Sequence, residues 1–278
     1  MSVSNLFMNA RKTYQHLFPG ISLQHRRQSS LRRYKHEVHS ELTTLDDPLG
    51  SLQPVPSHTI LLGQCMDGLP FLMGLGDPDI GAILISCEVG CGRTRQLQTM
   101  VNSAIRTHFP HELQIAILTT DPAEWDFLQA LPKNRKYLHS IHAWKENQTE
   151  EVIKQITELA EARRQGQRQG VDVLLFLDDF DSVEELSYET QVNLHWLLEY
   201  GSQSGVWIIG TLKADLAKGF RYWVNTFRTR IVGRVQQPED ADILAMKPGS
   251  QATNLVSGAF KVWTGNSWLT YSLLPLGE

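Results

Sequence analysis

Residues 82–94 read AILISCEVGCGRT, an apolar run followed by a loop that contains two glycines. Apolar side chains then recur at helical spacing from Leu97 to Ile105, so the sequence predicts a strand, a loop and a helix in succession. This context and the loop's outline are those of a phosphate-binding P-loop, G-x-x-x-x-G-K-[ST]. Backbone N–H groups and the positive end of the helix dipole would favour an anion there.

Two of the four fixed positions in this pattern are altered. Cys87 stands in place of the first glycine, so a Cβ occupies a position where the backbone turns tightly. Arg93 replaces the lysine; it keeps the charge, but its guanidinium is longer, planar and forked. Glu88 adds a carboxylate that would repel phosphate. The expected phosphate-binding residues are Gly90, Cys91, Gly92, Arg93 and Thr94.

The composition favours a soluble protein with one large domain. A chain of 278 residues with 41% hydrophobic content can bury a sizeable core. It has no apolar run of the ~18–20 residues needed to cross a bilayer, and its start lacks the pattern of a secretory signal. We therefore expect a cytoplasmic protein. Three cysteines are too few for a disulfide framework, and the sequence leaves a redox role for Cys87 and Cys91 open.

The net charge of −4 is unevenly distributed, because residues 11–36 contain arginines and lysines but no acidic residue. We assign residues 1–50 to a basic N-terminal arm and residues 51–278 to the main domain. Such an arm could contact DNA, an anionic membrane or an acidic partner. A solvated linker is the alternative.

Apolar strands alternate with helical patterns along the main domain, which predicts an α/β fold. The parallel sheet of such a fold is covered by helices on both faces. A hairpin is expected over residues 58–72. The further expected strands are 82–86, 114–119, 171–177, 206–210 and 228–235, with short β segments after 256, and the expected helices are 94–108, 122–131, 147–165, 188–200 and 216–225.

A second element of P-loop enzymes is an acidic residue at the end of an apolar strand. The run at 173–177 ends in Asp178 and Asp179. Asp178, with the hydroxyl of Thr94, would hold Mg²⁺, and Asp179 would orient the attacking water. Thr211 follows the next apolar strand, where a polar group can sense the γ-phosphate. The alternative is that these polar residues simply mark strand ends that meet solvent.

In the order of these motifs the chain resembles the FtsK/HerA family of ring-forming ATPases over residues 58–245. Besides the P-loop outline, the resemblance rests on the strand that ends in Asp178-Asp179. It also rests on SGVWIIGT at 204–211 and on TRIVGRV at 229–235. Asp121-Pro122 is similar to the start of the family's Asp-Pro-Lys.

The resemblance implies a RecA-like P-loop NTPase fold, ATP and Mg²⁺ as ligands, a homo- or hetero-oligomeric ring, and DNA as the threaded polymer. It also implies that an arginine of the next subunit completes the site; Arg230 is our candidate, with Arg228 and Arg234 beside it. These arginines could instead alternate along a strand and face solvent. The chain departs from the family at Ala123, in place of lysine, and at Leu212, in place of glutamine.

We therefore expect an ATP-binding domain related to DNA translocases, with hydrolysis weakened or lost. Asp179 is one methylene shorter than glutamate, and an error near 1 Å can cost ~10²-fold in rate. The alternatives are a non-catalytic subunit of a mixed ring and a protein-export motor. Lys213, Lys218 and Arg221, near aromatic residues, could follow a DNA backbone, although the aromatic residues could equally belong to the core.

Overall fold

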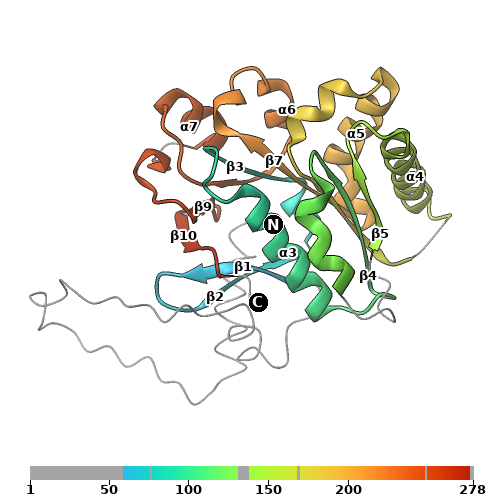
Figure 1. Ribbon diagram of the computed structural model, residues 1–278, viewed down its shortest axis with the longest axis horizontal. Coiled ribbons are helices and arrows are strands. Elements are labelled where there is room, and N and C mark those ends of the chain that lie inside the picture. Colours follow the sequence, from blue (N-terminus) through green and yellow to red (C-terminus); the bar gives the residue numbers. More distant parts are fainter. Residues whose placement is uncertain (1–58, 76, 131–137, 168–169, 248, 276–278) are drawn as a thin grey trace, which may run out of the picture.

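The computed structural model describes residues 59–75, 77–130, 138–167, 170–247 and 249–275, which share one ten-stranded sheet (Figure 1). The expected basic arm, 1–50, lies outside the described residues. The strands are β1 Thr59–Cys65, β2 Pro70–Gly74, β3 Ile83–Cys87, β4 Leu113–Thr119, β5 Leu138–Ala143, β6 Asp172–Leu177, β7 Val206–Lys213, β8 Thr229–Val232, β9 Ala259–Trp263 and β10 Trp268–Ser272.

The α-helices are fewer than the strands, and short 3₁₀ helices supplement them. The α-helices are α3 Arg93–Thr107, α4 Asn147–Arg164, α5 Tyr188–Tyr200, α6 Arg221–Thr226 and α7 Pro238–Ala245. The 3₁₀ helices are η1 Pro78–Ile80, η2 Pro122–Ala130, η3 Phe180–Glu185, η4 Gly201–Ser204, η5 Ala214–Leu216 and η6 Ala252–Asn254.

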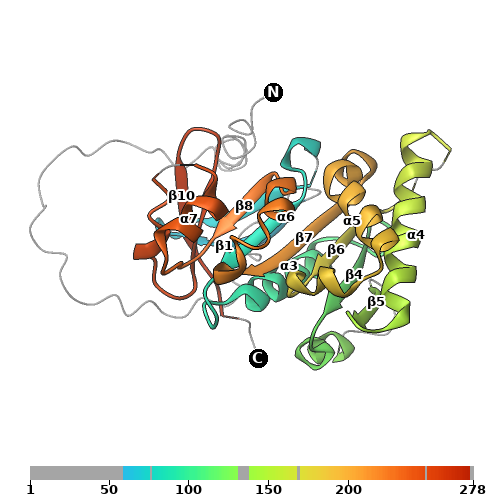
Figure 2. The same ribbon diagram turned by 90° about the horizontal axis from the view of Figure 1, so that it is seen from above.

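The sheet has a parallel part and an antiparallel part. Its strand order is β2-β1-β10-β9-β8-β3-β7-β6-β4-β5, and every neighbouring pair from β8 to β5 is parallel. The pairs from β8 to β2 are antiparallel and extend the sheet at one end (Figure 2). Because parallel strands end at a common edge, the loops after β3, β4, β6 and β7 are neighbours, and this edge is where α/β folds bind ligands.

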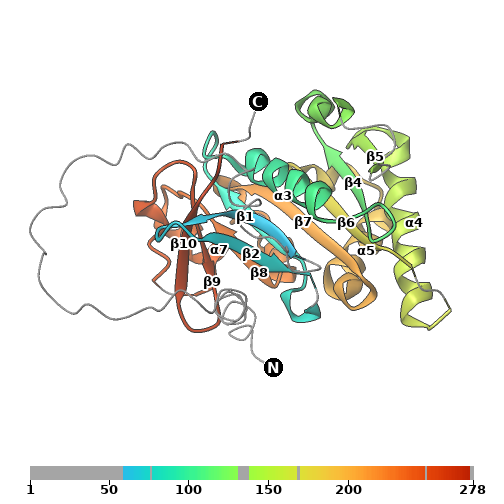
Figure 3. The ribbon, with the colours of Figure 1, turned by 90° about the horizontal axis from the view of Figure 1, so that it is seen from below.

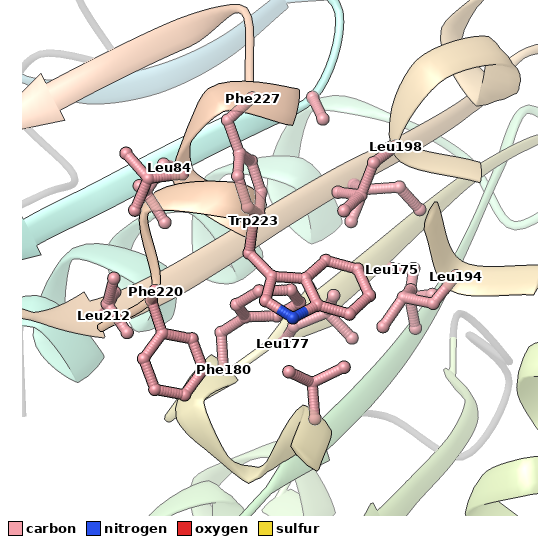
Figure 4. Packing of buried hydrophobic residues seen from close by; sticks show 14 of the residues in the cluster. Leu84, Leu175, Leu177, Phe180, Leu194, Leu198, Leu212, Phe220, Trp223 and Phe227 are labelled. Carbon is pink, nitrogen blue, oxygen red and sulfur yellow. The ribbon is translucent and has the colours of Figure 1, made fainter. Parts of the chain in front are cut away.

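Helices cover both faces of the sheet, and each face has its own hydrophobic core. On one face α3 and η2 pack against the strands (Figure 3), and on the other α4, α5, α6 and α7 do so. Figure 4 shows the second core, where the ring of Phe180 meets Trp223 and Phe227 edge-on, with centroids 5.4 and 5.3 Å apart. The expected α/β fold with a mainly parallel sheet covered on both faces is confirmed.

Several boundaries differ from the expectation for local reasons. The helix expected at 216–225 is split into η5 and α6, with Gly219 between them, because glycine is a poor helix former. The segment 122–130 is 3₁₀ rather than α. Two elements, β5 and α7, were not predicted, although α7 begins with Pro238 and two acidic residues, a typical helix start. Within the described residues, no helix combines the length and apolar character that a bilayer span requires.

Candidate nucleotide-binding site

The loop between β3 and α3 has the backbone geometry of a phosphate cradle. Gly90 and Gly92 have φ angles of 75° and 103°, in the left-handed region that favours glycine. Their N–H groups have no acceptor among the described residues, and α3 starts directly after Gly92. An added Cβ at Gly90 would meet nothing within 4 Å, so the loop is open at this point. These features fit an anion at the start of α3.

Residues that flank the C-terminal strands β9 and β10 hold this loop. Ser257 Oγ donates to the carbonyl of Gly90 at 3.3 Å, and the N–H of Gly258 donates to the carbonyl of Cys91 at 3.2 Å. Leu273 lies close to Gly92, since a Cβ added to this glycine would come within 2.9 Å of Leu273 Cδ1. The carbonyls of Gly90 and Cys91 are thus used by the chain itself, and the N–H of Cys91 donates to the carbonyl of Glu88 at 3.2 Å. The N–H groups of Gly90 and Gly92 remain for a ligand.

Cys87 does not disturb the cradle, which corrects the expectation from sequence. It is the last residue of β3 and is fully buried in the core that α3 covers. Its Cβ lies beside Gly233, where an added Cβ would approach it to 2.7 Å. Burial raises the pKa of the Cys87 thiol to about 12, against the effect of the nearby Arg93 charge. The thiol is therefore a packed, unreactive group.

Glu88 is also engaged elsewhere. Its N–H donates to the carbonyl of Arg234 at 2.9 Å, and its Oε1 accepts the N–H of Gln236 at 2.8 Å. The carboxylate that was expected to repel phosphate is thus bound by the segment that follows β8.

Asp178 joins the three motifs that the sequence suggested. It lies just after β6, 1% exposed, and its Oδ1 accepts hydrogen bonds from Thr211 Oγ1 at 2.8 Å and from Thr94 Oγ1 at 3.3 Å. Burial raises its pKa to about 6; the hydrogen bond from Thr211 opposes this shift, and the charge of Asp179 adds to it. One carboxylate and one hydroxyl at the start of a phosphate cradle fit Mg²⁺, which takes its other ligands from phosphate and water.

The described residues offer no cluster of three or more His, Cys, Asp or Glu side chains for a metal. A magnesium ion at Asp178 and Thr94 would therefore depend on phosphate oxygens. The residues present fit an ion that arrives with a nucleotide.

Asp179 is held by surrounding groups on both carboxylate oxygens. Its backbone is in the left-handed region, with φ 52°, and its N–H donates to Thr211 Oγ1 at 2.8 Å. Thr120 Oγ1 donates to Oδ2 at 2.5 Å, while Oδ1 lies 3.6 Å from Arg93 Nη2 and 3.9 Å from Lys213 Nζ. The two contacts of Oδ1 are longer than hydrogen bonds, and the side chain is 21% exposed.

Arg93 spans the inner side of the loop. Nη1 donates to the carbonyl of Cys87 at 3.0 Å, and Nη2 pairs with Asp179. The side chain is only 10% exposed, and its Nε has no hydrogen-bond partner within the described part of the chain. The guanidinium thus connects the beginning of the loop with the end of β6.

Four polar residues of this edge were missed as site residues: Thr120, Glu124, Asp181 and Lys213. Lys213 was assigned to a possible DNA-binding cluster, but it ends β7 beside the P-loop. The pKa of Glu124 is raised by partial burial and then by the charges of Asp121 and Asp179, so it lies near the site. The sequence could have indicated two of these residues by their position, because Thr120 follows one apolar strand of the parallel sheet and Lys213 ends another.

The structure corrects the role given to Arg230. Its guanidinium is buried and donates to the backbone carbonyls of Val224, Phe227, Ile243 and Leu244. The guanidinium is thus engaged inside its own chain, and this position speaks against the expected role at the site of a neighbouring subunit.

The two neighbouring arginines lie elsewhere on the sheet. Arg228 precedes β8 at the amino edge of the parallel strands, and its N–H donates to the carbonyl of Ala82. Arg234 follows β8 at the carboxyl edge.

The aromatic residues of the possible DNA-binding cluster are divided between core and surface. Phe220 and Trp223 are 8% exposed and belong to the core in Figure 4. Tyr222 is 66% exposed, and Lys218 and Arg221 are exposed as well. The core interpretation therefore holds for two of the three aromatic residues.

Comparisons with known proteins show similarity in structure but not in sequence. No protein-family model matches the chain, and no curated protein matches it in sequence. Among solved structures, it is similar to Thermomonospora curvata EccC (ATPases 2 and 3) in complex with a signal sequence peptide. The TM-score is 0.66 with 15% identity, over 83% of this chain and 43% of that one.

Two further solved structures are similar. EssC (ATPases 2 and 3) from Geobacillus thermodenitrificans has a TM-score of 0.65 with 19% identity, over 80% of this chain and 45% of EssC. The pCW3 conjugation coupling protein TcpA, in a monomer form with ATPγS, has a TM-score of 0.57 with 15% identity, over 79% of this chain and 67% of TcpA. The chain spans less than half of the EccC and EssC structures. It has the fold of FtsK/HerA-type P-loop ATPases, and the resemblance inferred from its motifs is confirmed at that level.

Proposed function

We propose that this domain binds ATP with Mg²⁺ in the manner of FtsK/HerA-type ATPases and hydrolyses it slowly or not at all. Gly90 and Gly92 would offer backbone N–H groups to phosphate, and Arg93 would neutralise it. Cys91, between the two glycines, would hold the shape of the loop through its N–H bond to the carbonyl of Glu88. Thr94 and Asp178 would hold the metal, and Thr211 would fix Asp178. Bound Mg²⁺ would neutralise phosphate charge.

The observation that carries this proposal is the meeting of three distant segments at one oxygen atom. Asp178 Oδ1 accepts from Thr94, at the start of α3, and from Thr211, in β7. A carboxylate that merely ended a strand would lie in solvent, whereas Asp178 is 1% exposed. Burying a carboxylate is unfavourable unless hydrogen bonds or a cation compensate it. The arrangement supports a cation-binding role for Asp178 rather than that of a solvent-exposed acidic residue at a strand end.

The contacts of Asp179 and Arg93 support weak hydrolysis. A general base must be free to bind the attacking water, and both oxygens of Asp179 have partners in this state. Arg93 would have to leave the carbonyl of Cys87 and Asp179 before it could bind phosphate. Binding therefore competes with contacts inside the chain, and turnover additionally needs the release of Asp179.

Calorimetric titration of the full chain with ATP, with and without Mg²⁺, tests the proposal. We expect Mg²⁺-dependent binding that Thr94→Ala weakens, while Thr253→Ala, at an exposed site, leaves it unchanged. Phosphate release measured on the same samples tests the slow hydrolysis. Absence of any binding would refute the nucleotide site, and fast turnover that Asp178→Ala abolishes would refute the weakened catalysis.

A second candidate function is that of an ATPase domain in a protein-export machine. The similarity to EccC, solved with a signal sequence peptide, favours a polypeptide substrate. The basic residues 11–36 favour DNA instead. Retention of the full chain on DNA, compared with a chain that lacks residues 1–50, separates the two. Salt-sensitive retention that needs the arm would support DNA, and its absence would support export.

Assembly into a homo- or hetero-oligomeric ring is part of the same proposal. Light scattering on the purified chain, with and without Mg²⁺ and ATP, tests it. A monomer under all conditions would refute a homo-oligomeric ring and leave only a ring formed with other subunits.

A further inference from the structure

Lys213 lies at the rim of the phosphate cradle. It is the last residue of β7, and its Cα pairs with that of Cys87, the residue from which the P-loop starts. Side chains two residues apart along a strand lie on the same face, so Lys213 shares a face with Thr211, whose hydroxyl contacts Asp178. Leu212, between them, is buried in the opposite core.

The ammonium of Lys213 is held loosely between two carboxylates. Nζ lies 3.3 Å from Asp181 Oδ2 and 3.9 Å from Asp179 Oδ1, and the side chain is 35% exposed. The other oxygen of Asp181 is buried, with no hydrogen-bond partner among the described residues. Partly exposed ion pairs of this kind contribute little to stability, because solvent screens them. A stronger anion could therefore draw the ammonium away.

Arg93 is less available than Lys213, although it stands at the motif's lysine position. Its guanidinium bonds the carbonyl of Cys87 and pairs with Asp179, and it is more buried than Lys213. A planar fork fixed at two points cannot follow a phosphate as a compact ammonium on a flexible chain can. The site thus has one pinned cation and one movable cation.

We propose that Lys213 supplies the movable ammonium that the altered P-loop lacks, and that it binds the terminal phosphate of a nucleoside triphosphate. This inference rests on the proposed function, since it presupposes a nucleotide in the cradle. Lys213 Nζ lies beside Asp179, the carboxylate at the position of the catalytic base, and the base belongs next to the terminal phosphate. The ammonium therefore discriminates a triphosphate from a diphosphate.

The carboxylates around the site make such a cation necessary. Asp178, Asp179 and Asp181 follow one another closely at the end of β6, and all three side chains lie at the cradle or beside its cations. A triphosphate adds further negative charge, of which bound Mg²⁺ would balance only a part, and Arg93 is already paired with Asp179. Movement of Lys213 from Asp181 to phosphate places a positive charge where the repulsion would be greatest.

The test compares two ligands on the full chain with Mg²⁺: ADP, and an ATP analogue with a non-hydrolysable imido bridge between the β and γ phosphorus atoms. Lys213→Met keeps the length of the side chain without its charge, Lys213→Arg keeps the charge, and Lys218→Met is the control at an exposed lysine nearby. Calorimetric titration gives the affinities, and thermal unfolding without nucleotide confirms that each variant is folded.

Lys213→Met is expected to weaken the analogue about tenfold, the effect of losing about 1.4 kcal/mol of interaction, and ADP by less than about threefold. Lys213→Arg should restore most of the affinity, and Lys218→Met should change neither ligand. If the natural chain binds the analogue and Lys213→Met weakens it no more than ADP, the role of Lys213 is refuted while the nucleotide site stands. If the natural chain binds neither ligand, the proposed function itself fails, and this inference fails with it.

Discussion

Asp178→Asn is expected to make the folded chain more stable while it removes the metal site. The pKa of Asp178 is raised from 3.8 to about 6, mainly by burial. Since one pKa unit corresponds to about 1.4 kcal/mol, ionised Asp178 disfavours the folded state by about 3 kcal/mol at pH 7. Asparagine carries no charge, and its oxygen can still accept from Thr94 and Thr211. Its new NH₂ group lacks a built acceptor, at a cost of about 1 kcal/mol, so the expected net gain is about 2 kcal/mol.

The pH dependence of this gain has a definite sign. In the unfolded chain Asp178 loses its proton near pH 3.8, whereas in the folded chain it keeps the proton up to about pH 6. Between these values the unfolded state binds fewer protons, so the stability of the natural chain falls as the pH rises. Below about pH 4 only the cost of the NH₂ group remains, so Asp178→Asn should be about 1 kcal/mol less stable than the natural chain; above about pH 6 it should reach the full gain of about 2 kcal/mol.

Urea unfolding followed by circular dichroism, at a series of pH values from 4 to 7.5, measures this difference. Asp215→Asn, at an exposed carboxylate, is the control and should change stability by less than about 0.5 kcal/mol. With Mg²⁺ and ATP, the natural chain should gain stability that Asp178→Asn does not gain. If the variant were less stable than the natural chain at pH 7, or if the difference did not vary with pH, ionised Asp178 would not disfavour the folded state as inferred.

Three further substitutions probe separate parts of the site. Arg93→Lys should tighten Mg²⁺-dependent ATP binding about tenfold, because a lysine ammonium would not be held by Asp179 and the carbonyl of Cys87. Adding Cys87→Gly should not raise the affinity further in calorimetry. A large further gain would contradict the packing of Cys87 away from the cradle. Gly233→Ala should destabilise the fold by about 1–3 kcal/mol in urea unfolding, because its Cβ would lie 2.7 Å from Cys87 Cβ; Cys87→Gly should rescue part of this loss, and no rescue would be evidence against that contact. Arg230→Met should destabilise by about 2–4 kcal/mol, since it leaves backbone carbonyls without donors; a fully stable variant that lacked only a subunit-dependent activity would return Arg230 to a role between subunits.

The fold and the centre of the site could be predicted because both follow from local patterns. A strand end is predicted at two places, by the apolar run before Asp178 and by the loop with Gly90 and Gly92. Parallel strands bring such ends together at one edge of the sheet. The role of Lys213 could not be predicted, since a lysine that ends a strand is as typical of a solvent-exposed edge.

Other features depended on partners distant in the sequence. Cys87 fits only because Gly233, just after the adjacent strand β8, has no side chain. Arg230 alternates along a strand like a surface residue, and its burial depends on the carbonyls of α7, a helix that the sequence analysis did not find. The edge strand β5 carries histidines and a serine rather than a continuous apolar run, so its pattern was too weak to recognise.

The bracing of the P-loop by Ser257, Gly258 and Leu273 makes the carboxy-terminal hairpin a structural part of the nucleotide site. A fragment that stopped before Ser257 would keep every recognisable motif and yet lose the groups that restrain its loop carbonyls. The amide of Gly258, which donates to Cys91, is also a built-in reporter. Its rate of hydrogen–deuterium exchange should slow when a ligand settles in the cradle and makes the loop more rigid.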